Sequence, residues 1–297
     1  MAVGPLQWVP IHGEVGGPDA ELLNEALPTG RTSVSEVSAE GVVAWVRVQH
    51  GGTRPLLIVD GEHVVGAKQN RIFNASFLVA PGQTVDLPVT CVERRRWSYK
   101  STSFKADDAT ISSKIRAMKL GMLGASLGRG GGHHCDQQVV WREVDRYLAQ
   151  TGTDSQSAAF GDGFQSRRAG TERSLDLLEP RPGQVGVAAV REGAIVGMDI
   201  FGSASLYGRG WKKVARGLLA EVYREAEVSK GDEALKLVKR ALEVVATTAP
   251  TRTAAPGIGE TLHVTAQDLT FACISADDVL FHGVCAPSVE DGSAAHP

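Results

Sequence analysis

The stretch from Asp60 to Phe104 holds most of the side chains in this sequence that could carry out chemistry. It contains two polar clusters, which strand-like sequence separates. Together the clusters supply carboxylates, amides, basic groups and an indole: Glu62, Lys68, Gln69, Asn70, Arg71, Glu93, Arg96 and Trp97. Such groups can accept hydrogen bonds from hydroxyls, donate them to phosphates and stack on a base. The stretch is therefore the predicted functional site.

The charge of this stretch suits a phosphorylated ligand. Between Gly61 and Lys105 there are seven basic and three acidic residues, although the whole chain has a formal net charge of -3. Arginine binds two phosphate oxygens through a fixed fork of donors. Arg71 and Arg96 are therefore predicted to hold phosphates, and Trp97 to stack on a base.

The carboxylates of the two clusters are the predicted catalytic groups. Glu62 and Glu93 would accept hydrogen bonds from ribose hydroxyls, or one of them would act as a general base. Lys68, Gln69 and Asn70 would orient the ligand, since adjacent amides offer donors and acceptors on both sides of an extended segment. A nucleotide or an ADP-ribose derivative would satisfy all of these groups, and a reaction would be hydrolysis or transfer at a phosphate or glycosidic bond.

The same residues also have a structural interpretation. Residues 94–96 could be the solvated end of a strand, Trp97 could belong to the core, and Glu62 and Arg71 could form an exposed ion pair, worth roughly 0–1 kcal/mol. A second functional hypothesis is a non-enzymatic interaction module, in which the arginine-rich patch binds an acidic protein partner. A ligand site needs a concave pocket, whereas an interaction patch would be convex or spread out.

Other reactive side chains allow weaker hypotheses. Cys91 could be a nucleophile next to the arginines, although a free cysteine in a strand is usually a small buried hydrophobe. His63 could be a general base. The run His133-His134-Cys135-Asp136 has metal-ligating types, but a glycine-rich loop before a helix capped by Asp136 is the favoured interpretation. No metal site is predicted, and the sequence specifies no cofactor.

The composition is typical of a soluble globular protein, with 42% hydrophobic and 22% charged residues. The overall charge of -3 makes nucleic acid an unlikely partner. The sequence has no apolar run of about 18 residues, so we expect no membrane-spanning helix. The four cysteines are scattered, which favours reduced thiols and a cytoplasmic location.

The elements that must position the clusters begin where the sequence takes up a period of two. The predicted strands cover residues 32–38, 42–49, 55–60, 70–79 and 83–93. Consecutive strands with short turns favour an antiparallel sheet or sandwich. Residues 32–97 are thus predicted to be rich in β-structure.

Helical periodicity dominates residues 109–150, and residues 184–286 are mixed. The predicted helices cover residues 19–27, 109–126, 136–150, 211–226 and 231–245, and further strands cover 184–190, 194–201, 261–266, 269–275 and 279–284. Residues 151–182 and 247–256 are predicted to be irregular. We therefore predict one α+β domain over residues 6–286, with an antiparallel sheet or sandwich-like core, helices inserted in the middle and the C-terminal half, and a disordered tail at 287–297.

Several runs of the central stretch resemble a known bacterial family. They are Gly61-Glu62, Gly66-Ala67-Lys68-Gln69-Asn70-Arg71, Pro88-Val89-Thr90-Cys91-Val92-Glu93 and Arg96-Trp97. They resemble the ARG and Rhodanese-Phosphatase-superfamily-associated protein domain. The resemblance implies an association with ADP-ribosylglycohydrolases and rhodanese-phosphatase proteins, close to the metabolism of ADP-ribose derived from NAD. It implies no defined activity.

Overall fold

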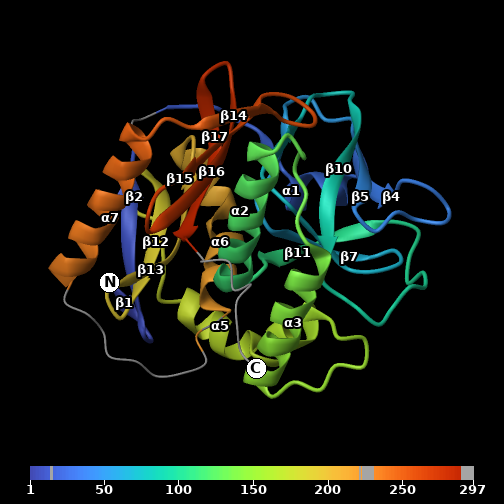
Figure 1. The fold of residues 1–297 in the computed structure, drawn as a ribbon, viewed down its shortest axis with the longest axis horizontal. Helices are drawn as coiled ribbons and strands as arrows, with labels where there is room; N and C mark the ends of the chain where they lie inside the picture. Colours follow the sequence, from blue (N-terminus) through green and yellow to red (C-terminus); the bar gives the residue numbers. More distant parts are fainter. Residues whose placement is uncertain (14–15, 221, 223–230, 289–297) are drawn as a thin grey trace.

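The structure is a computed structural model that describes residues 1–13, 16–220, 222 and 231–288. Most of the predicted tail at 287–297 therefore lies outside the described residues, as does the end of the helix predicted at 211–226. Two antiparallel sheets and the helices around them make up most of the molecule (Figure 1). The predicted α+β class with antiparallel sheets is confirmed.

The larger sheet joins the beginning of the chain to its end. Its eight strands lie in the order β1 (Ala2–Val3), β2 (Leu6–His12), β12 (Gln184–Arg191), β13 (Ala194–Phe201), β17 (Val279–Pro287), β16 (Leu269–Ala276), β15 (Glu260–Thr265) and β14 (Thr251–Ala254). All neighbours are antiparallel. The sequence did not predict β1 and β2, and β14 forms within the predicted linker at 247–256.

Two helices cover opposite faces of this sheet. They are α6 (Ala204–Leu219) and α7 (Gly231–Thr247). In β2, Trp8 packs with residues of α6, whereas Val9 packs with residues of α7, because successive side chains of a strand point to opposite faces. The start predicted for the first of these helices, at residue 211, was wrong: the helix begins at Ala204, where the side chain of Ser203 caps it by accepting a hydrogen bond from Leu206 N.

The second sheet has six strands and contains most of the predicted functional stretch. Its order is β11 (Phe104–Thr110), β7 (Glu62–Gly66), β8 (Arg71–Phe73), β10 (Thr84–Cys91), β5 (Trp45–His50) and β4 (Thr32–Glu36). The sheet curls, so that its two end strands β4 and β11 come close together without being paired strands. In β5, Val46 and Val48 are fully buried and Arg47 and Gln49 are exposed, as the predicted alternation requires.

Buried polar residues break the strand predicted at 70–79 into two. Residues 74–76 leave the six-stranded sheet after β8, because the Asn74 amide donates to His133 O and Ser76 Oγ contacts His282. The chain continues as β9 (Phe77–Val79) in a small third sheet with β6 (Leu56–Ile58) and β3 (Glu21–Leu22). The helix predicted at 19–27 was likewise too long: it is divided among β3, α1 (Leu23–Ala26) and η1 (Leu27–Thr29).

The middle of the chain forms four helices: α2 (Ser113–Gly128), α3 (Gln137–Thr151), α4 (Phe160–Ser166) and α5 (Arg168–Leu175). Asp136 caps α3 as predicted, since its carboxylate accepts hydrogen bonds from Gln138 N and Val139 N. The prediction that residues 151–182 are irregular was wrong. Here α4 and α5 are held by the burial of Phe160, Phe164 and Leu175 against the rest of the protein.

Hydrophobic clusters connect the two large sheets. Ala272, Val284 and Ala286 of the eight-stranded sheet belong to the same buried cluster as Val64 and Phe73 of the six-stranded sheet. Among the described residues, no helix is long and apolar enough to cross a membrane.

Candidate functional site

Three of the predicted site residues, Gln69, Asn70 and Arg96, converge on a fourth, Glu93. Glu93 has no exposed surface, and Arg96 is 8% exposed. The guanidinium of Arg96 donates to both carboxylate oxygens of Glu93, at 2.8 and 2.5 Å. The backbone N–H of Asn70 donates to the same carboxylate at 3.0 Å, and the Gln69 amide donates to Glu93 O at 2.9 Å. Burial by itself raises the pKa of Glu93, but the hydrogen bonds from Arg96 and Asn70 hold it below its ordinary value.

The remaining donors of Arg96 are also occupied by the protein itself. Nη1 donates to Ala67 O at 2.7 Å and Ser98 O at 2.8 Å, and Nη2 reaches Gly66 O and Asn70 Oδ1 at 3.2 Å. Arg96 thus clamps the turn between β7 and β8 to the segment after β10. No guanidinium N–H remains to bind a phosphate in this arrangement.

Arg71 holds a different loop. Its side chain is fully buried, donates to Val43 O, and pairs with Glu36 at 3.3 Å. The guanidinium carbon lies 5.6 Å from the centre of the Trp97 ring. Arg71 and Arg96 therefore have separate carboxylate partners, and Arg71 ties the loop between β4 and β5 to the six-stranded sheet.

Glu62 does not join the Glu93 cluster. It is 1% exposed and forms an ion pair with Lys213, which α6 contributes from far along the chain. Its second oxygen accepts a hydrogen bond from Val59 N at 3.0 Å. The two carboxylates predicted to be catalytic thus have different partners, and no pattern in the sequence indicated the role of Lys213.

Three loops form an exposed aromatic and aliphatic surface over Arg71. We call it the Trp97 surface and define it by Val42, Val43, Lys68, Trp97 and Tyr99. Its apolar members are all exposed: Val42 to 40%, Val43 to 38%, Trp97 to 46% and Tyr99 to 51%. The ammonium of Lys68 lies 5.3 and 5.0 Å from the centres of the two rings, and the Tyr99 hydroxyl donates to Ala39 O at 3.0 Å. The loops project from the end of the six-stranded sheet farthest from α7 (Figure 1).

Basic side chains flank this surface in sequence. Arg94, Arg95 and Lys100 are all exposed. Arg94 pairs with Asp145 at 3.0 Å, and Lys100 lies 3.9 Å from the buried Glu93. Arg95 has no side-chain ion pair within the described part of the chain. The surface therefore combines large exposed side chains with positive charge.

A buried ionic network that the sequence did not reveal links the two sheets through α2. Arg116 donates to Asp60 at 3.1 Å and, through both Nη atoms, to Asp199 at 2.9 and 2.6 Å. Lys119 pairs with Asp60 and also donates to Asn74 O at 2.7 Å. Burial by itself raises the pKa of Asp199, but the charge of Arg116 lowers it to about 2. All four charged side chains are almost completely buried.

His282 and Ser76 extend this network without forming a catalytic relay. Ser76 Oγ lies 2.8 Å from His282 Nδ1 and accepts a hydrogen bond from Asp60 N at 3.0 Å. His282 Nε2 lies 3.2 Å from Asp199 Oδ1, but it makes no hydrogen bond of acceptable geometry. His282 has no exposed surface and Ser76 is 5% exposed, so a substrate has no access to them here.

The other reactive residues have structural surroundings. Burial raises the pKa of the Cys91 thiol above its ordinary value, which opposes a nucleophilic thiolate. His63 Nδ1 lies 2.8 Å from Asp107 Oδ2. His133 contacts Thr261 at 2.7 Å, and in the described residues no group of three or more His, Cys, Asp or Glu side chains is arranged to hold a metal ion.

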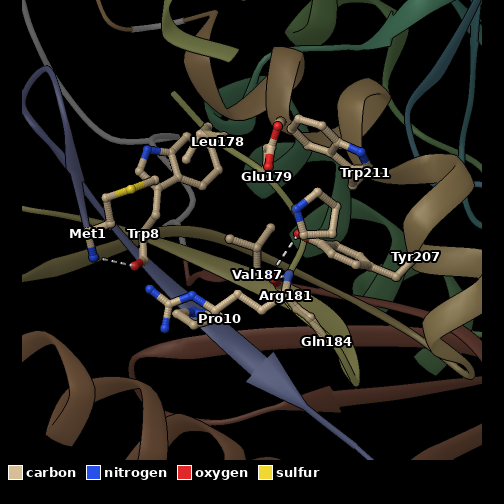
Figure 2. A pocket seen from close by; sticks show the side chains of 12 residues that line it. Met1, Trp8, Pro10, Leu178, Glu179, Arg181, Gln184, Val187, Tyr207 and Trp211 are labelled. Carbon is tan, nitrogen blue, oxygen red and sulfur yellow. Dashed lines mark hydrogen bonds between the residues drawn. The ribbon is translucent and has the colours of Figure 1, made fainter. Parts of the chain in front are cut away.

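Two cavities lie away from the predicted site residues. One of about 720 Å³ opens between β4, β11 and η1, and its lining includes Thr32, Ser33, Lys105 and Asp107. The other, of about 40 Å³, lies between β2, β12 and α6 (Figure 2). None of the eight predicted site residues lines either cavity.

Comparisons with known proteins give one match. No curated protein and no solved structure matches the chain. The model of one family matches residues 1–286, which is nearly the whole chain. The chain therefore belongs to the family of the ARG and Rhodanese-Phosphatase-superfamily-associated Protein domain.

Proposed function

We propose that this protein is an interaction module whose Trp97 surface binds an acidic protein partner. The observation that carries the proposal is the exposure of Val42, Val43, Trp97 and Tyr99, at 38–51% each, on two loops that hold each other in place. Large exposed apolar patches on proteins mark interaction sites. Tryptophan and tyrosine supply much of the binding energy of protein interfaces.

Charge gives the proposal its partner class. Lys68, Arg95 and Lys100 contribute positive charge at or beside the surface, whereas Arg94 is already paired with Asp145. An acidic surface would complement this arrangement, speed association and orient the partner. Partners to test first are the ADP-ribosylglycohydrolase and rhodanese-phosphatase proteins that the family name associates with this domain. We propose a cytoplasmic location, which suits the four unpaired cysteines.

Binding of a phosphorylated, nucleotide-derived ligand of the ADP-ribose type is the second candidate function. The association in the family name favours it. Such a ligand would have to displace the contacts that Arg71 and Arg96 make with Glu36 and Glu93, or bind elsewhere. The geometry therefore gives the interaction module more support. In the interaction module, Lys68 contributes to the Trp97 surface. No substrate-binding or catalytic role is proposed there for the other predicted residues, which are Glu62, Gln69, Asn70 and Glu93.

The decisive experiment is a titration of each purified partner with the full chain by isothermal titration calorimetry, at about 50 and 300 mM salt. Trp97→Ala combined with Tyr99→Ala is expected to weaken binding at least tenfold, since such anchors are worth roughly 2 kcal/mol or more. Arg95→Glu is expected to weaken it further, and more strongly at low salt, because exposed charges are screened. Leu235→Ala, which is 44% exposed on α7, is the matched control.

The same protein samples distinguish the second candidate. Thermal unfolding is measured with ADP-ribose, its phosphorylated forms and NAD; a ligand at 100 times its dissociation constant adds about 2.7 kcal/mol of stability. Stabilisation by these compounds that survives the Trp97 and Tyr99 substitutions would favour a nucleotide ligand. The interaction module would be contradicted if the affinity for the partner changed neither with the Trp97 and Tyr99 substitutions nor with the salt concentration.

A further inference from the structure

The small cavity beside α6 is lined by three aromatic side chains. Trp8 comes from β2, and Tyr207 and Trp211 lie one turn apart on the same face of α6, where residues spaced by four are neighbours (Figure 2). Trp8 is 4% exposed and Tyr207 is 3% exposed, so both rings are fixed by packing. The indole of Trp8 lies on one side of the cavity in Figure 2, and the rings of Tyr207 and Trp211 lie on the other.

The polar groups at the base of the cavity already satisfy one another. The Gln184 amide donates to the Tyr207 hydroxyl at 2.8 Å, and its oxygen accepts a hydrogen bond from Arg181 N at 2.9 Å. Burial raises the pKa of Tyr207 well above its ordinary value, so the ring stays an uncharged phenol at neutral pH. The cavity therefore offers a ligand mainly the faces and edges of aromatic rings.

Two side chains of opposite charge lie at the rim of the cavity. The carboxylate of Glu179 lies between the two indoles in the view of Figure 2, and the guanidinium of Arg181 lies at the opposite end, beside Pro10. Both residues are exposed, and neither side chain has an ion pair or hydrogen bond among the residues that the structure describes. A ligand with one positive and one negative end could pair with both.

Aromatic rings with a nearby carboxylate favour a cation, because the faces of the rings carry partial negative charge. Methylated ammonium groups are the cations that such cages recognise, since they are weakly hydrated and have no strong need for hydrogen bonds. The cavity volume is about 40 Å³, and a single water needs roughly 10–15 Å³ on the same measure. The cavity thus suits a group of a few heavy atoms, and the remainder of a ligand would extend past the rim.

We infer that this cavity binds a small zwitterion of the betaine class, with its methylated ammonium group among Trp8, Tyr207 and Trp211 and its carboxylate toward Arg181. Glu179 adds a negative charge close to the ammonium group. The site is separate from the Trp97 surface, so it does not depend on the proposed interaction function. No chemical step is involved; the site recognises and holds its ligand.

The test uses three probes that differ in one property each. Glycine betaine has both charges, choline lacks the carboxylate, and 3,3-dimethylbutanoate has the shape of betaine without the positive charge. Isothermal titration calorimetry of the full chain is expected to show that betaine binds and that 3,3-dimethylbutanoate, which lacks the positive charge, binds about tenfold more weakly, since one desolvated cation–π contact accounts for a factor of that size. Choline is expected to bind less tightly than betaine.

Variants assign the effect to individual side chains. Trp211→Leu is expected to weaken betaine binding about tenfold, Glu179→Gln to weaken betaine and choline alike, and Arg181→Gln to weaken betaine but not choline. Asp176→Asn is the matched control, because Asp176 is exposed on the preceding segment and does not line the cavity. The inference is overturned if neither betaine nor choline binds the unmodified chain at up to about 10 mM, or if 3,3-dimethylbutanoate binds as tightly as betaine. These probe comparisons require no variant to fold.

Discussion

At the level of single residues, Arg95 and Arg96 have different roles although they are neighbours in the sequence. Arg96 is 8% exposed and all of its donors contact the protein, whereas its neighbour Arg95 is exposed. A buried guanidinium with a fully occupied fork stabilises the fold around it, and only the exposed one can meet a partner. The same distinction separates Arg71, which holds a loop, from Lys68, which lies against exposed rings.

Removal of the Arg96 side chain should destabilise the protein strongly. Arg96→Ala leaves the buried carboxylate of Glu93 without its partner, and breaking a buried ion pair in this way typically costs about 3–5 kcal/mol. Urea denaturation followed by circular dichroism measures the loss in the free energy of unfolding. Arg95→Ala is the control and should change stability by less than about 0.5 kcal/mol. Equal effects of the two substitutions would contradict the assignment of Arg96 as a clamp.

Acid should weaken the ionic network between the sheets. The pKa of Asp199 is about 2 in the folded protein and 3.8 is its ordinary value, so its contribution is present above the unfolded pKa and is lost as the pH falls through the folded pKa. The free energy of unfolding should therefore fall by roughly 2 kcal/mol between about pH 5 and pH 2 on account of this group. Urea denaturation at several pH values tests this. Asp199→Asn should remove this decrease in the free energy of unfolding with falling pH, even though the substitution also lowers stability at neutral pH.

At the element scale, α6 is the helix that connects the parts of the molecule. It contacts β12 and β13 of the larger sheet and β11 of the six-stranded sheet. Its Lys213 pairs with Glu62 of β7, and its Tyr207 and Trp211 line the small cavity. The close approach of α6 to β11 depends on a glycine at the contact.

Gly217 should be the position of α6 that least tolerates a side chain. A Cβ atom there would lie 2.0 Å from Thr110 Oγ1 and 2.9 Å from Ile111 O. Gly217→Ala should therefore destabilise the protein by about 1–3 kcal/mol, in spite of the better helix propensity of alanine. Gly208→Ala, on the same helix with nothing within 4 Å of its Cβ, is the control and should raise stability by up to about 1 kcal/mol. Differential scanning calorimetry of the two variants measures both effects.

At the scale of the whole molecule, the two large sheets share a hydrophobic cluster and a buried ionic network. Separating them would expose Val284 and Phe73 and leave Asp199 without Arg116, so neither sheet is expected to keep its structure alone. We therefore predict that residues 6–286 unfold in a single cooperative transition. Calorimetry should give equal calorimetric and van't Hoff enthalpies. Two resolved transitions, or a stable fragment after limited proteolysis, would show instead that the predicted single domain is two.

Features that depend on neighbouring residues could be predicted from the sequence. The alternation in β5, the two strands β12 and β13 and the cap of α3 by Asp136 were all predicted, because strand periodicity and helix caps are set within a few residues. The motif in residues 61–97 also identified the family. Gln69, Asn70, Glu93 and Arg96, which contact one another in the structure, all lie in the stretch that the sequence predicts to be the functional site.

Which charged side chains are already paired within the protein could be learned only from its three-dimensional structure. Glu62 meets Lys213, Arg71 meets Glu36, and Arg116 meets Asp199, and each pair joins segments that are distant in sequence. A side chain can bind a ligand only if its hydrogen-bonding capacity is not already used by the fold, and such long-range partners leave no periodic signal in the sequence. For the same reason β2, which lies between β1 and β12, became a strand of the larger sheet only through pairing with residues far along the chain. The residue types in a short stretch of sequence thus indicate which chemical groups are present, whereas contacts with distant parts of the chain determine which of these groups are accessible.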